Sequence, residues 1–324
     1  MKFGFTIAFI LASVSVCCAE KFAFIGCQKL SQGNSAIFNG AKNTAAEISR
    51  SAHADYKVEF YSMPDSPAGQ ISALDSAFLG GFSGAIVAPA AEDATLLRRI
   101  GELQKRGFYV AVVGSCLDSD AVVGVATDTA KTAQAVEKAL SPLGKKTEIF
   151  CYFKGTGSLR TTPNAVAADS EFLRGRLSRA DFEKIFSQRP CTVVECLFYG
   201  VYARENAEEI MRRDDFCEVF FSPDLLSDIS PIKPDHDRVF SLCIGALPHL
   251  EYYLQSGQID CCIYDDFYGW GVYAARSLIA VGNLASGASG KKRGLPQPVR
   301  KVVPPVVVDK KNWREFSKDW NSWQ

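Results

Sequence analysis

The sequence contains only three histidines, His53, His236 and His249, which lie far apart without an i, i+4 pair. Zinc sites and serine- or cysteine-nucleophile centres need a positioned imidazole, so both are disfavoured. The 36 Lys and Arg balance 36 Asp and Glu, which argues against a general nucleic-acid-binding surface. An apolar fraction of 47% excludes a disordered tail. The composition favours binding over chemistry and predicts a protein that is not an enzyme and carries no cofactor or metal.

The sequence also lacks a C-x-x-C motif, so a zinc ribbon or a thioredoxin-like redox centre is not supported. Several cysteines lie inside apolar runs, where a thiol behaves as a small hydrophobe: Cys27, Cys151, Cys196 and Cys261. Cys261 and Cys262 are neighbours in a predicted strand and point to opposite faces, which disfavours a bond between them. We expect most of these thiols to be buried. A disulfide is an alternative that the sequence does not assign to particular cysteines.

The N-terminal segment is typical of a signal peptide. Lys2 precedes an apolar stretch from Phe3 to Val16 that is too short to span a membrane. Small residues at Cys17 and Ala19 fit cleavage before Glu20. The alternative is that this stretch forms a buried first strand. No later apolar run approaches the roughly twenty residues that a membrane span needs, so the pattern predicts an exported, periplasmic protein.

Short apolar runs alternate with amphipathic helical patterns from Lys21 onward, which is typical of βαβ units on a parallel sheet. The predicted strands are Phe22–Cys27, Tyr56–Tyr61, Gly84–Ala88, Tyr109–Gly114, Ala121–Ala126, Thr147–Phe153, Thr192–Leu197, Cys217–Phe221, Val239–Ile244 and Ile259–Tyr264. Helical patterns lie between most of them. The expected fold class is therefore α/β, with two doubly wound, Rossmann-like lobes.

Two C-terminal segments depart from this alternation. The stretch from Gly282 to Pro305 is rich in Gly, Ser, Lys and Pro and is expected to cross between the lobes, before an apolar run at Val302–Val308. A helix that Asn312 could cap is predicted beyond it, with four aromatic residues on one face: Trp313, Phe316, Trp320 and Trp323. This face is expected to dock onto the second lobe, and the alternative is that it binds a partner.

Several segments, in this order, resemble motifs of the type I periplasmic binding proteins, the ribose- and galactose-binding family of bacterial ABC importers. They are Ile37–Ala41, Gln70-Ile71 followed by Gly84–Pro89, Gly107–Val113, Val125–Asp128, Gly155–Arg160 and Ser256–Gly271. The resemblance covers essentially the whole mature chain. It implies a periplasmic binding protein-like I fold, with two lobes joined by three crossings and the ligand bound between them.

The resemblance also implies how the chain is divided. We expect a signal peptide at residues 1–19, an N-terminal lobe at 20–127 plus 266–296, and a C-terminal lobe at 128–265 plus 297–324. The three crossings would then lie near Asp128, near Asp265 and within Pro296–Pro305.

Seven residues match positions that bind ligand in the family: Gln28, Asn34, Ser115, Arg160, Tyr202, Asp224 and Asp265. Asn34 could instead cap the helix that follows the first strand, Arg160 could be an exposed loop residue, and Tyr202 could be a core residue. Asp265 and Asp266 form a carboxylate pair that could act as general acid and base, but no histidine accompanies them. Gly33, Ser115, Pro223 and Gly245 depart from the family's pattern.

The resemblance implies an exported solute-binding protein that clamps a small polar ligand, such as a sugar, and delivers it to an ABC permease. The alternative is a ligand-sensing or regulatory protein of the same fold, which presents its ligand to a membrane sensor and does not transport. Both imply a monomer that does not bind nucleic acid. A cytoplasmic repressor of this fold is disfavoured, because the N-terminus resembles a signal peptide and not a helix-turn-helix.

Overall fold

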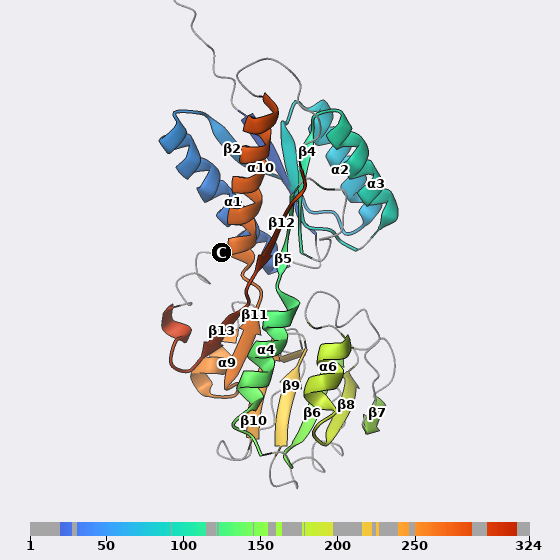
Figure 1. The fold of residues 1–324 in the computed structure, drawn as a ribbon, viewed down its shortest axis with the longest axis vertical. Coiled ribbons are helices and arrows are strands. Elements are labelled where there is room, and N and C mark those ends of the chain that lie inside the picture. Colours follow the sequence, from blue (N-terminus) through green and yellow to red (C-terminus); the bar gives the residue numbers. More distant parts are fainter. Residues whose placement is uncertain are drawn as a thin grey trace, which may run out of the picture.

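The computed structural model has two lobes, one above the other in Figure 1, each built on a single β-sheet. It describes residues 20–27, 31–91, 93–114, 121, 123–144, 146–154, 160–163, 177, 179–196, 216–221, 225–226, 239–245, 250–286 and 297–315. The predicted α/β class with two doubly wound lobes is confirmed. The predicted signal peptide, residues 1–19, lies outside the described part of the chain.

The first lobe has a six-stranded parallel sheet in the order β12-β5-β4-β3-β1-β2. Its strands are β1 (Glu20–Ile25), β2 (Tyr56–Ser62), β3 (Gly84–Val87), β4 (Tyr109–Val113), β5 (Val123–Thr127) and β12 (Val299–Val303). Its helices are α1 (Ser31–Ala52), α2 (Pro67–Leu79), α3 (Ala94–Lys105) and α10 (Phe267–Ser286).

Helices cover both faces of this sheet, which is why its central strands are continuous apolar runs. Phe22 and Phe24 of β1 pack on the side of α1 and α10, whereas Ala23 and Ile25 pack on the side of α2 and α3. All four are essentially buried.

Helices α1 and α10 lie against each other through two glycines. A Cβ atom on Gly40 of α1 would overlap the backbone carbonyl oxygen of Tyr268, and one on Gly271 of α10 would overlap that of Ile37. Only residues without a side chain allow the two backbones to approach this closely. The pair Gly40 and Gly271 therefore sets the distance between α1 and α10.

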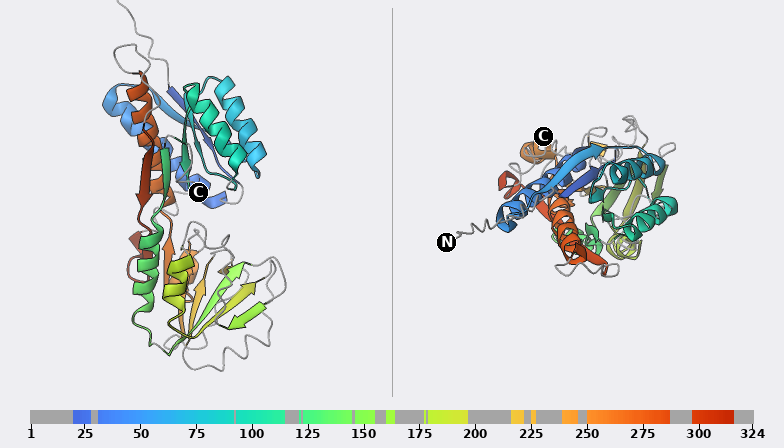
Figure 2. Two further views of the ribbon diagram at one scale, coloured as in Figure 1. Left: turned by 45° about the vertical axis from the view of Figure 1, so that its right-hand side comes forward. Right: turned by 90° about the horizontal axis from the view of Figure 1, so that it is seen from above.

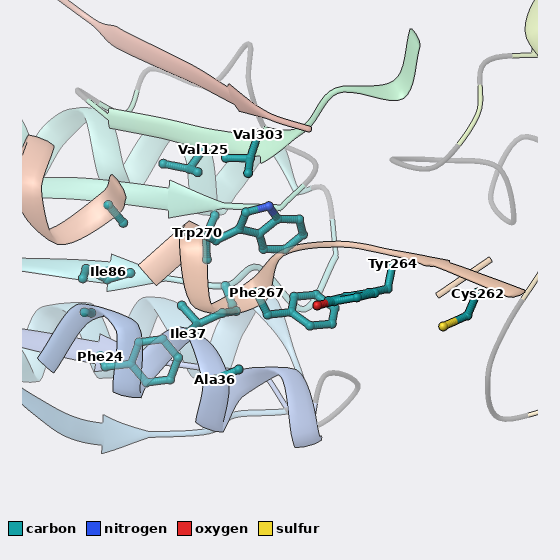
Figure 3. Packing of buried hydrophobic residues seen from close by; sticks show 14 of the residues in the cluster. Phe24, Ala36, Ile37, Ile86, Val125, Cys262, Tyr264, Phe267, Trp270 and Val303 are labelled. Atoms are coloured by element: carbon teal, nitrogen blue, oxygen red, sulfur yellow. The ribbon is translucent and has the colours of Figure 1, made fainter. Parts of the chain in front are cut away.

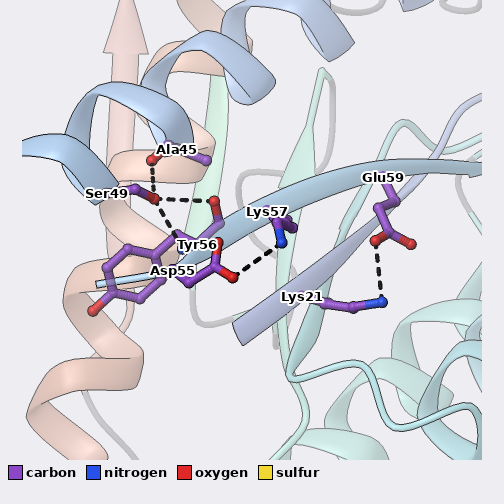
Figure 4. A network of polar contacts seen from close by, with 7 residues as sticks. All are labelled: Lys21, Ala45, Ser49, Asp55, Tyr56, Lys57 and Glu59. Carbon is purple, nitrogen blue, oxygen red and sulfur yellow. Dashed lines mark hydrogen bonds and ion pairs between the residues drawn. The ribbon is translucent and has the colours of Figure 1, made fainter. Parts of the chain in front are cut away.

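Strand β2 forms one edge of the first sheet and carries exposed charges (Figure 4). Lys21 pairs with Glu59 at 3.3 Å and Lys57 pairs with Asp55 at 3.0 Å. About half of each side chain is exposed, so these ion pairs contribute little stability. Their charges instead disfavour pairing of this edge with another strand.

The second lobe has a seven-stranded sheet in the order β13-β11-β10-β9-β6-β8-β7, with antiparallel strands β13 and β7 at its edges. Its strands are β6 (Glu148–Lys154), β7 (Arg160–Pro163), β8 (Cys191–Cys196), β9 (Phe216–Phe220), β10 (Val239–Ile244), β11 (Cys261–Tyr264) and β13 (Val306–Asp309). Its described helices are α4 (Thr129–Leu140), α6 (Arg179–Phe186) and α9 (Leu250–Ser256).

The third crossing corrects the predicted lobe boundary. Residues 297–324 were expected in the second lobe, but Val299–Val303 pairs in parallel with β5 and completes the first sheet. The chain changes lobes at Pro304–Pro305, between β12 and β13. Proline has no N–H for a ladder, so this pair splits the apolar run Val302–Val308 between two sheets. The other two crossings follow β5 and β11, near Asp128 and Asp265 as expected.

The predicted C-terminal helix is described only at its start. Trp313–Glu315 forms one helical turn, and Trp313 is partly buried against the main core cluster. The Asn312 side chain does not cap this turn: its Oδ1 accepts from the N–H of Asp309 at 2.9 Å, and its Nδ2 donates to the carbonyl of Val307 at 3.0 Å. It closes the turn after β13. Phe316, Trp320 and Trp323 lie outside the described residues.

Candidate ligand-binding site

The carboxyl ends of the parallel strands in the two sheets face each other, and we call these the interlobe edges. Strand β5 leads directly into α4 of the second lobe, and β11 leads directly into α10 of the first (Figure 2). Because the neighbouring strands are parallel to them, β1, β3 and β4 end on the same side as β5, and β6, β9 and β10 end on the same side as β11. Open α/β sheets bind ligands outside such edges.

Asp265 lies at this junction and links two crossings. The Thr127 hydroxyl, at the end of β5, donates a hydrogen bond to Asp265 Oδ1 at 2.5 Å. The adjacent Asp128 N–H donates to the carbonyl of Val303 at 2.8 Å, which ties the first crossing to the third. Thr127 is buried and Asp265 is partly exposed. The three crossings are therefore joined by hydrogen bonds, and one carboxylate is held at the interlobe edge.

Asp266 has a different role from its neighbour. Its Oδ1 accepts from the N–H of Gly269 at 2.8 Å, and its carbonyl accepts from the N–H of Trp270 at 2.8 Å. These bonds satisfy donors in the first turn of α10, where a carboxylate is also favoured by the helix dipole. The predicted carboxylate pair thus divides into a crossing residue, Asp265, and a helix cap, Asp266.

Two aromatic rings of α10 pack under the interlobe edge of the first lobe (Figure 3). Phe267 and Trp270 are each 5% exposed and meet edge to face, with ring centroids 5.0 Å apart. A Cβ atom on Gly33 would lie 3.4 Å from the Phe267 ring. Phe267 therefore occupies the space beside Gly33, one of the positions that depart from the family's pattern.

Asn34 lies in the first turn of α1, and its side chain contacts the loop that follows β1. Asn34 is 1% exposed, its Nδ2 donates to the carbonyl of Cys27 at 2.5 Å, and its Oδ1 accepts from the Cys27 N–H at 3.3 Å. Its Nδ2 also lies 3.1 Å from the sulfur of Met63. The capping alternative is wrong, because α1 already begins at Ser31. Both polar ends of the amide bind the backbone of Cys27, so the side chain faces its own loop and not a ligand.

A second buried amide, Gln70 of α2, was not recognised from the sequence as a site residue. It is 0% exposed, and its Nε2 donates to the carbonyls of Gly26 at 3.0 Å and Ala88 at 2.7 Å. Its Oε1 accepts from the N–H of Ala90 at 3.0 Å. The sequence pattern could have indicated that Gln70 is buried, because it lies at helical spacing from three apolar residues on the buried face of α2: Ala73, Leu74 and Ala77.

Most other predicted ligand-binding residues fall outside the described part of the chain. These are Gln28, Ser115, Tyr202 and Asp224. Arg160 begins β7, whose backbone pairs antiparallel with β8, and stands opposite Glu195. Of the seven candidates, the structure describes the side chains of Asn34 and Asp265, both at the interlobe edge.

The structure gives the burial of seven cysteine side chains, and all seven are buried: Cys27, Cys151, Cys191, Cys217, Cys243, Cys261 and Cys262. The sulfurs of Cys151 and Cys191 lie 3.7 Å apart. Cys191 stands opposite Ile149, two residues before Cys151, which puts the two Cα atoms roughly 8 Å apart for standard strand spacings. A disulfide here would require the backbone to move.

Burial controls the protonation of these thiols. Desolvation raises the pKa of Cys151, Cys217 and Cys262 well above the ordinary thiol value. The pKa of Cys261 is raised to about 12 by burial and by the nearby carboxylates of Asp309 and Asp260. A hydrogen bond from Cys151 lowers the pKa of Cys191. Most of these thiols therefore stay protonated and unreactive at neutral pH.

A groove of about 570 Å³ lies in the second lobe, between α4 and the edge strand β13. Its walls are largely apolar and include Ala135, Phe240, Pro304 and Val307. None of the seven predicted ligand-binding residues lines it. The groove is thus separate from the site predicted at the interlobe edges.

In the described part of the chain, no three His, Cys, Asp or Glu side chains gather closely enough to hold a metal ion. Among the same residues, no helix combines the length and the apolar character needed to cross a membrane.

No protein-family model matches the sequence, and no curated protein is similar enough to count as a relative. The similarity to solved structures is extensive, however. An ABC transporter solute-binding protein from Bacillus halodurans, with bound myo-inositol, is 14% identical with a TM-score of 0.61, over 93% of this chain and 98% of its own. A periplasmic ribose ABC transporter protein from Conexibacter woesei is 15% identical with a TM-score of 0.62, over 94% and 98%.

A third similar structure is XylFII in its complex with LytSN. It is 17% identical with a TM-score of 0.57, over 90% of this chain and 98% of its own. At these identities the comparisons establish the fold, and they confirm that the chain has the architecture of the type I periplasmic binding proteins. The crossings and the two facing interlobe edges belong to that architecture.

Proposed function

We propose that this protein is an exported solute-binding protein, which clamps a small polar ligand between its lobes and delivers it to an ABC permease. The observation that carries the proposal is the position of Asp265, a partly exposed carboxylate held by Thr127 where the crossings meet. A carboxylate accepts hydrogen bonds from hydroxyl groups and forms stronger bonds than a neutral acceptor. A sugar or a related polyol is the matching class of ligand.

Closure of the lobes would provide the binding energy. When the two interlobe edges approach, they exclude water and bring donors and acceptors from both lobes to the same ligand. We assign Asp265 from the crossing, Gln28 and Ser115 from the first lobe, and Arg160, Tyr202 and Asp224 from the second to these contacts. The proposal is supported by structures of the same fold, one of which holds myo-inositol.

A thermal-shift experiment on the mature protein tests ligand binding. The panel contains myo-inositol, D-ribose, D-galactose and D-tagatose, with nucleosides and amino acids as other classes. A ligand at one hundred times its dissociation constant should stabilise the protein by about 2.7 kcal/mol, because it binds only the folded state. Stabilisation by amino acids alone, or by nothing in the panel, would contradict a sugar-binding function.

Arg160→Ala tests the predicted contact from the second lobe. The variant should fold normally and bind the stabilising sugar more weakly by about 2 kcal/mol, because a charged, bidentate donor is lost. Lys184→Ala is the matched control, since this exposed lysine pairs only at the surface with Glu137 at 3.6 Å. Equal affinities by calorimetry for the wild type and Arg160→Ala would remove Arg160 from the site.

Export and cleavage after Ala19 are part of the proposal. Mass spectrometry of the protein secreted from the full-length gene should find an N-terminus at Glu20. Secreted protein that begins at Met1 would overturn the assignment.

The alternative function is ligand sensing without transport, in which the closed protein docks on a membrane sensor. The complex of XylFII with LytSN favours this alternative, because it shows a protein of this fold bound to a second protein. Genes for a permease and an ATPase beside this gene would support transport, whereas a neighbouring sensor gene without them would support sensing.

A further inference from the structure

We propose that Asn34 and Gln70 are positioning residues, which hold the loops after β1 and β3 in one conformation before ligand arrives. The proposal rests on the proposed function, because it takes these loops to be part of the ligand-binding edge. Neither side chain is assigned a direct contact with ligand. They act through the backbone that they hold.

The need for such residues follows from where the strands end. Gly26 is the first residue after β1 and Ala88 is the first after β3, and these two strands are parallel neighbours. Beyond the last ladder bonds, carbonyl groups that point into protein still require donors. Gln70 supplies donors to both carbonyls with its single Nε2 group, at 3.0 Å and 2.7 Å.

The same amide also fixes the next part of the second loop. Gln70 Oε1 accepts from the N–H of Ala90 at 3.0 Å, so this one side chain binds backbone at both ends of Pro89. Among uncharged side chains of this length, only an amide carries two N–H donors together with a carbonyl acceptor. Gln70 therefore links two adjacent loops in a fixed relation.

Asn34 of α1 also binds the backbone of the loop after β1, which Gln70 of α2 binds through Gly26. Its amide pairs with both the N–H and the carbonyl of Cys27, and Cys27 directly precedes Gln28, a proposed ligand contact. A Cβ atom on Gly26 would lie 2.7 Å from Asn34 Oδ1, so the loop backbone rests directly on the amide. Residues 26 and 27 are thus held by Gln70 and Asn34 together.

This arrangement fits ligand binding better than core stability. Apolar residues of similar size could fill the same space in a core, since volume-conserving apolar replacements are well tolerated. The hydrogen bonds reach backbone that lies outside helices and strands, at the edge that faces the second lobe. A loop that is ordered in advance lowers the entropic cost of binding.

The decisive experiment compares Gln70→Met, which keeps the length but loses the amide, with Leu74→Ala. Leu74 lies on the same helix and is also 0% exposed, but it is apolar, so its truncation destabilises the lobe by packing alone. Asn34→Asp keeps the acceptor for the Cys27 N–H but places an oxygen against the Cys27 carbonyl, so it breaks the bond to that carbonyl outright. All proteins are compared at a temperature at which their near-ultraviolet circular dichroism shows them folded.

The first measurement needs no ligand. Amide hydrogen exchange of the peptides that span residues 23–36 and 86–93 is followed in the free protein. We expect exchange about tenfold or more faster in these peptides in Gln70→Met, and less change in Leu74→Ala at equal loss of melting temperature. Unchanged exchange in Gln70→Met and Asn34→Asp would overturn the proposal.

The second measurement is calorimetric affinity for the panel sugar that stabilises the wild type most. Gln70→Met should bind it about tenfold to a hundredfold more weakly, whereas Leu74→Ala should bind within about twofold of the wild type. An equal loss in both variants would show a structural role only and would overturn the proposal. If no panel sugar binds the wild type, sugar binding fails as a function, and the exchange measurement still decides whether these amides hold the loops.

Discussion

Both lobes are built on a largely parallel sheet, but the contacts that stand out in the described residues differ between them. In the first lobe, the directional hydrogen bonds of Asn34 and Gln70 fix loops at the interlobe edge. In the second lobe, aromatic rings of β6 stack on rings at the end of β9 on both faces of the sheet, Tyr152 on Phe220 and Phe153 on Phe221. Of the cysteines in the described part of the chain, all but Cys27 lie in the second lobe.

The two kinds of contact have different effects: one mainly stabilises the fold, and the other mainly fixes the position of loops. Rings and thiols provide large, polarisable contact areas whose stabilising effect depends little on direction. Amide hydrogen bonds add less stability, but they specify where a loop lies. Changes in the core of the second lobe should therefore reduce stability, whereas changes at the edge of the first lobe should alter binding geometry.

The largest effect is expected from Phe153→Ala in the second lobe. The Phe153 ring is 3% exposed and lies 4.2 Å from the Phe221 ring, so its removal leaves a cavity. The variant should lose about 4 kcal/mol of unfolding free energy, measured by urea denaturation. Phe60→Ala is the control, since its ring is 51% exposed, and it should lose less than about 1 kcal/mol. Similar losses in both variants would contradict a core held by ring contacts.

Alkaline pH should weaken the second lobe next most strongly, through Cys261. Its pKa is about 12 in the folded protein and near 9.0 ordinarily, so above pH 9 the unfolded chain releases a proton that the folded chain retains. The stability that this thiol contributes is complete below pH 9 and is lost as the pH rises towards 12, and the loss by pH 11 is about 3 kcal/mol.

Urea denaturation at pH 8 and pH 11 measures this effect. Cys261→Ala should lose less stability between the two pH values than the wild type, by roughly that amount. Ile263→Val, an apolar change on the same strand, should follow the wild type. If Cys261→Ala lost as much stability between pH 8 and pH 11 as the wild type, the Cys261 thiol would not contribute to the pH dependence of stability.

In the first lobe, Gly271→Ala should cost about 2 kcal/mol, because its Cβ would overlap the carbonyl oxygen of Ile37 and force α1 and α10 apart. Gly144→Ala serves as control, since its Cβ would meet only the Thr147 hydroxyl, at 3.7 Å. Chemical denaturation compares the two. A Gly271→Ala protein as stable as Gly144→Ala would show that the helices do not depend on this close approach.

The smallest change in stability is expected at the junction of the lobes. Thr127→Val removes the hydrogen bond to Asp265 and should cost about 1 kcal/mol, because the partly exposed carboxylate can bind water instead. Thr127→Ser keeps the hydroxyl and should retain most of the stability. Equal melting temperatures for Thr127→Val and Thr127→Ser would assign the junction to the backbone bond between Asp128 and Val303.

Much of the fold could be predicted because each buried strand leaves a local mark. Runs such as Gly84–Ala88 and Tyr109–Gly114 are apolar without alternation, since helices cover both faces of the sheet. The split of Val302–Val308 could not be predicted in this way. Whether Val299–Val303 pairs with β5 or with a strand of the other lobe depends on long-range register and not on local composition.

The site was less predictable, because its polar residues are defined by partners that are distant in sequence. Asp265 could be placed from its position after a strand, but Thr127, its partner, is 138 residues away. Asn34 and Gln70 carry the donors and acceptors expected of ligand-binding residues. Whether such an amide faces a ligand or its own loop depends on how α1 and α2 are rotated against the sheet, which no motif records.

The crossing at Pro304–Pro305 has a consequence for the order in which the chain is synthesised. Residues 20–127 are made first, yet α10 and β12, which complete their sheet and cover one face of it, are made almost last. Until then Phe24 and Ile37, both fully buried in the finished protein, lack the contacts of α10. The first lobe therefore stays incompletely packed until residues 128–266, which form most of the second lobe, have been synthesised. Early and late segments have to meet across the longest separations in the chain, which makes slow folding intrinsic to this connectivity.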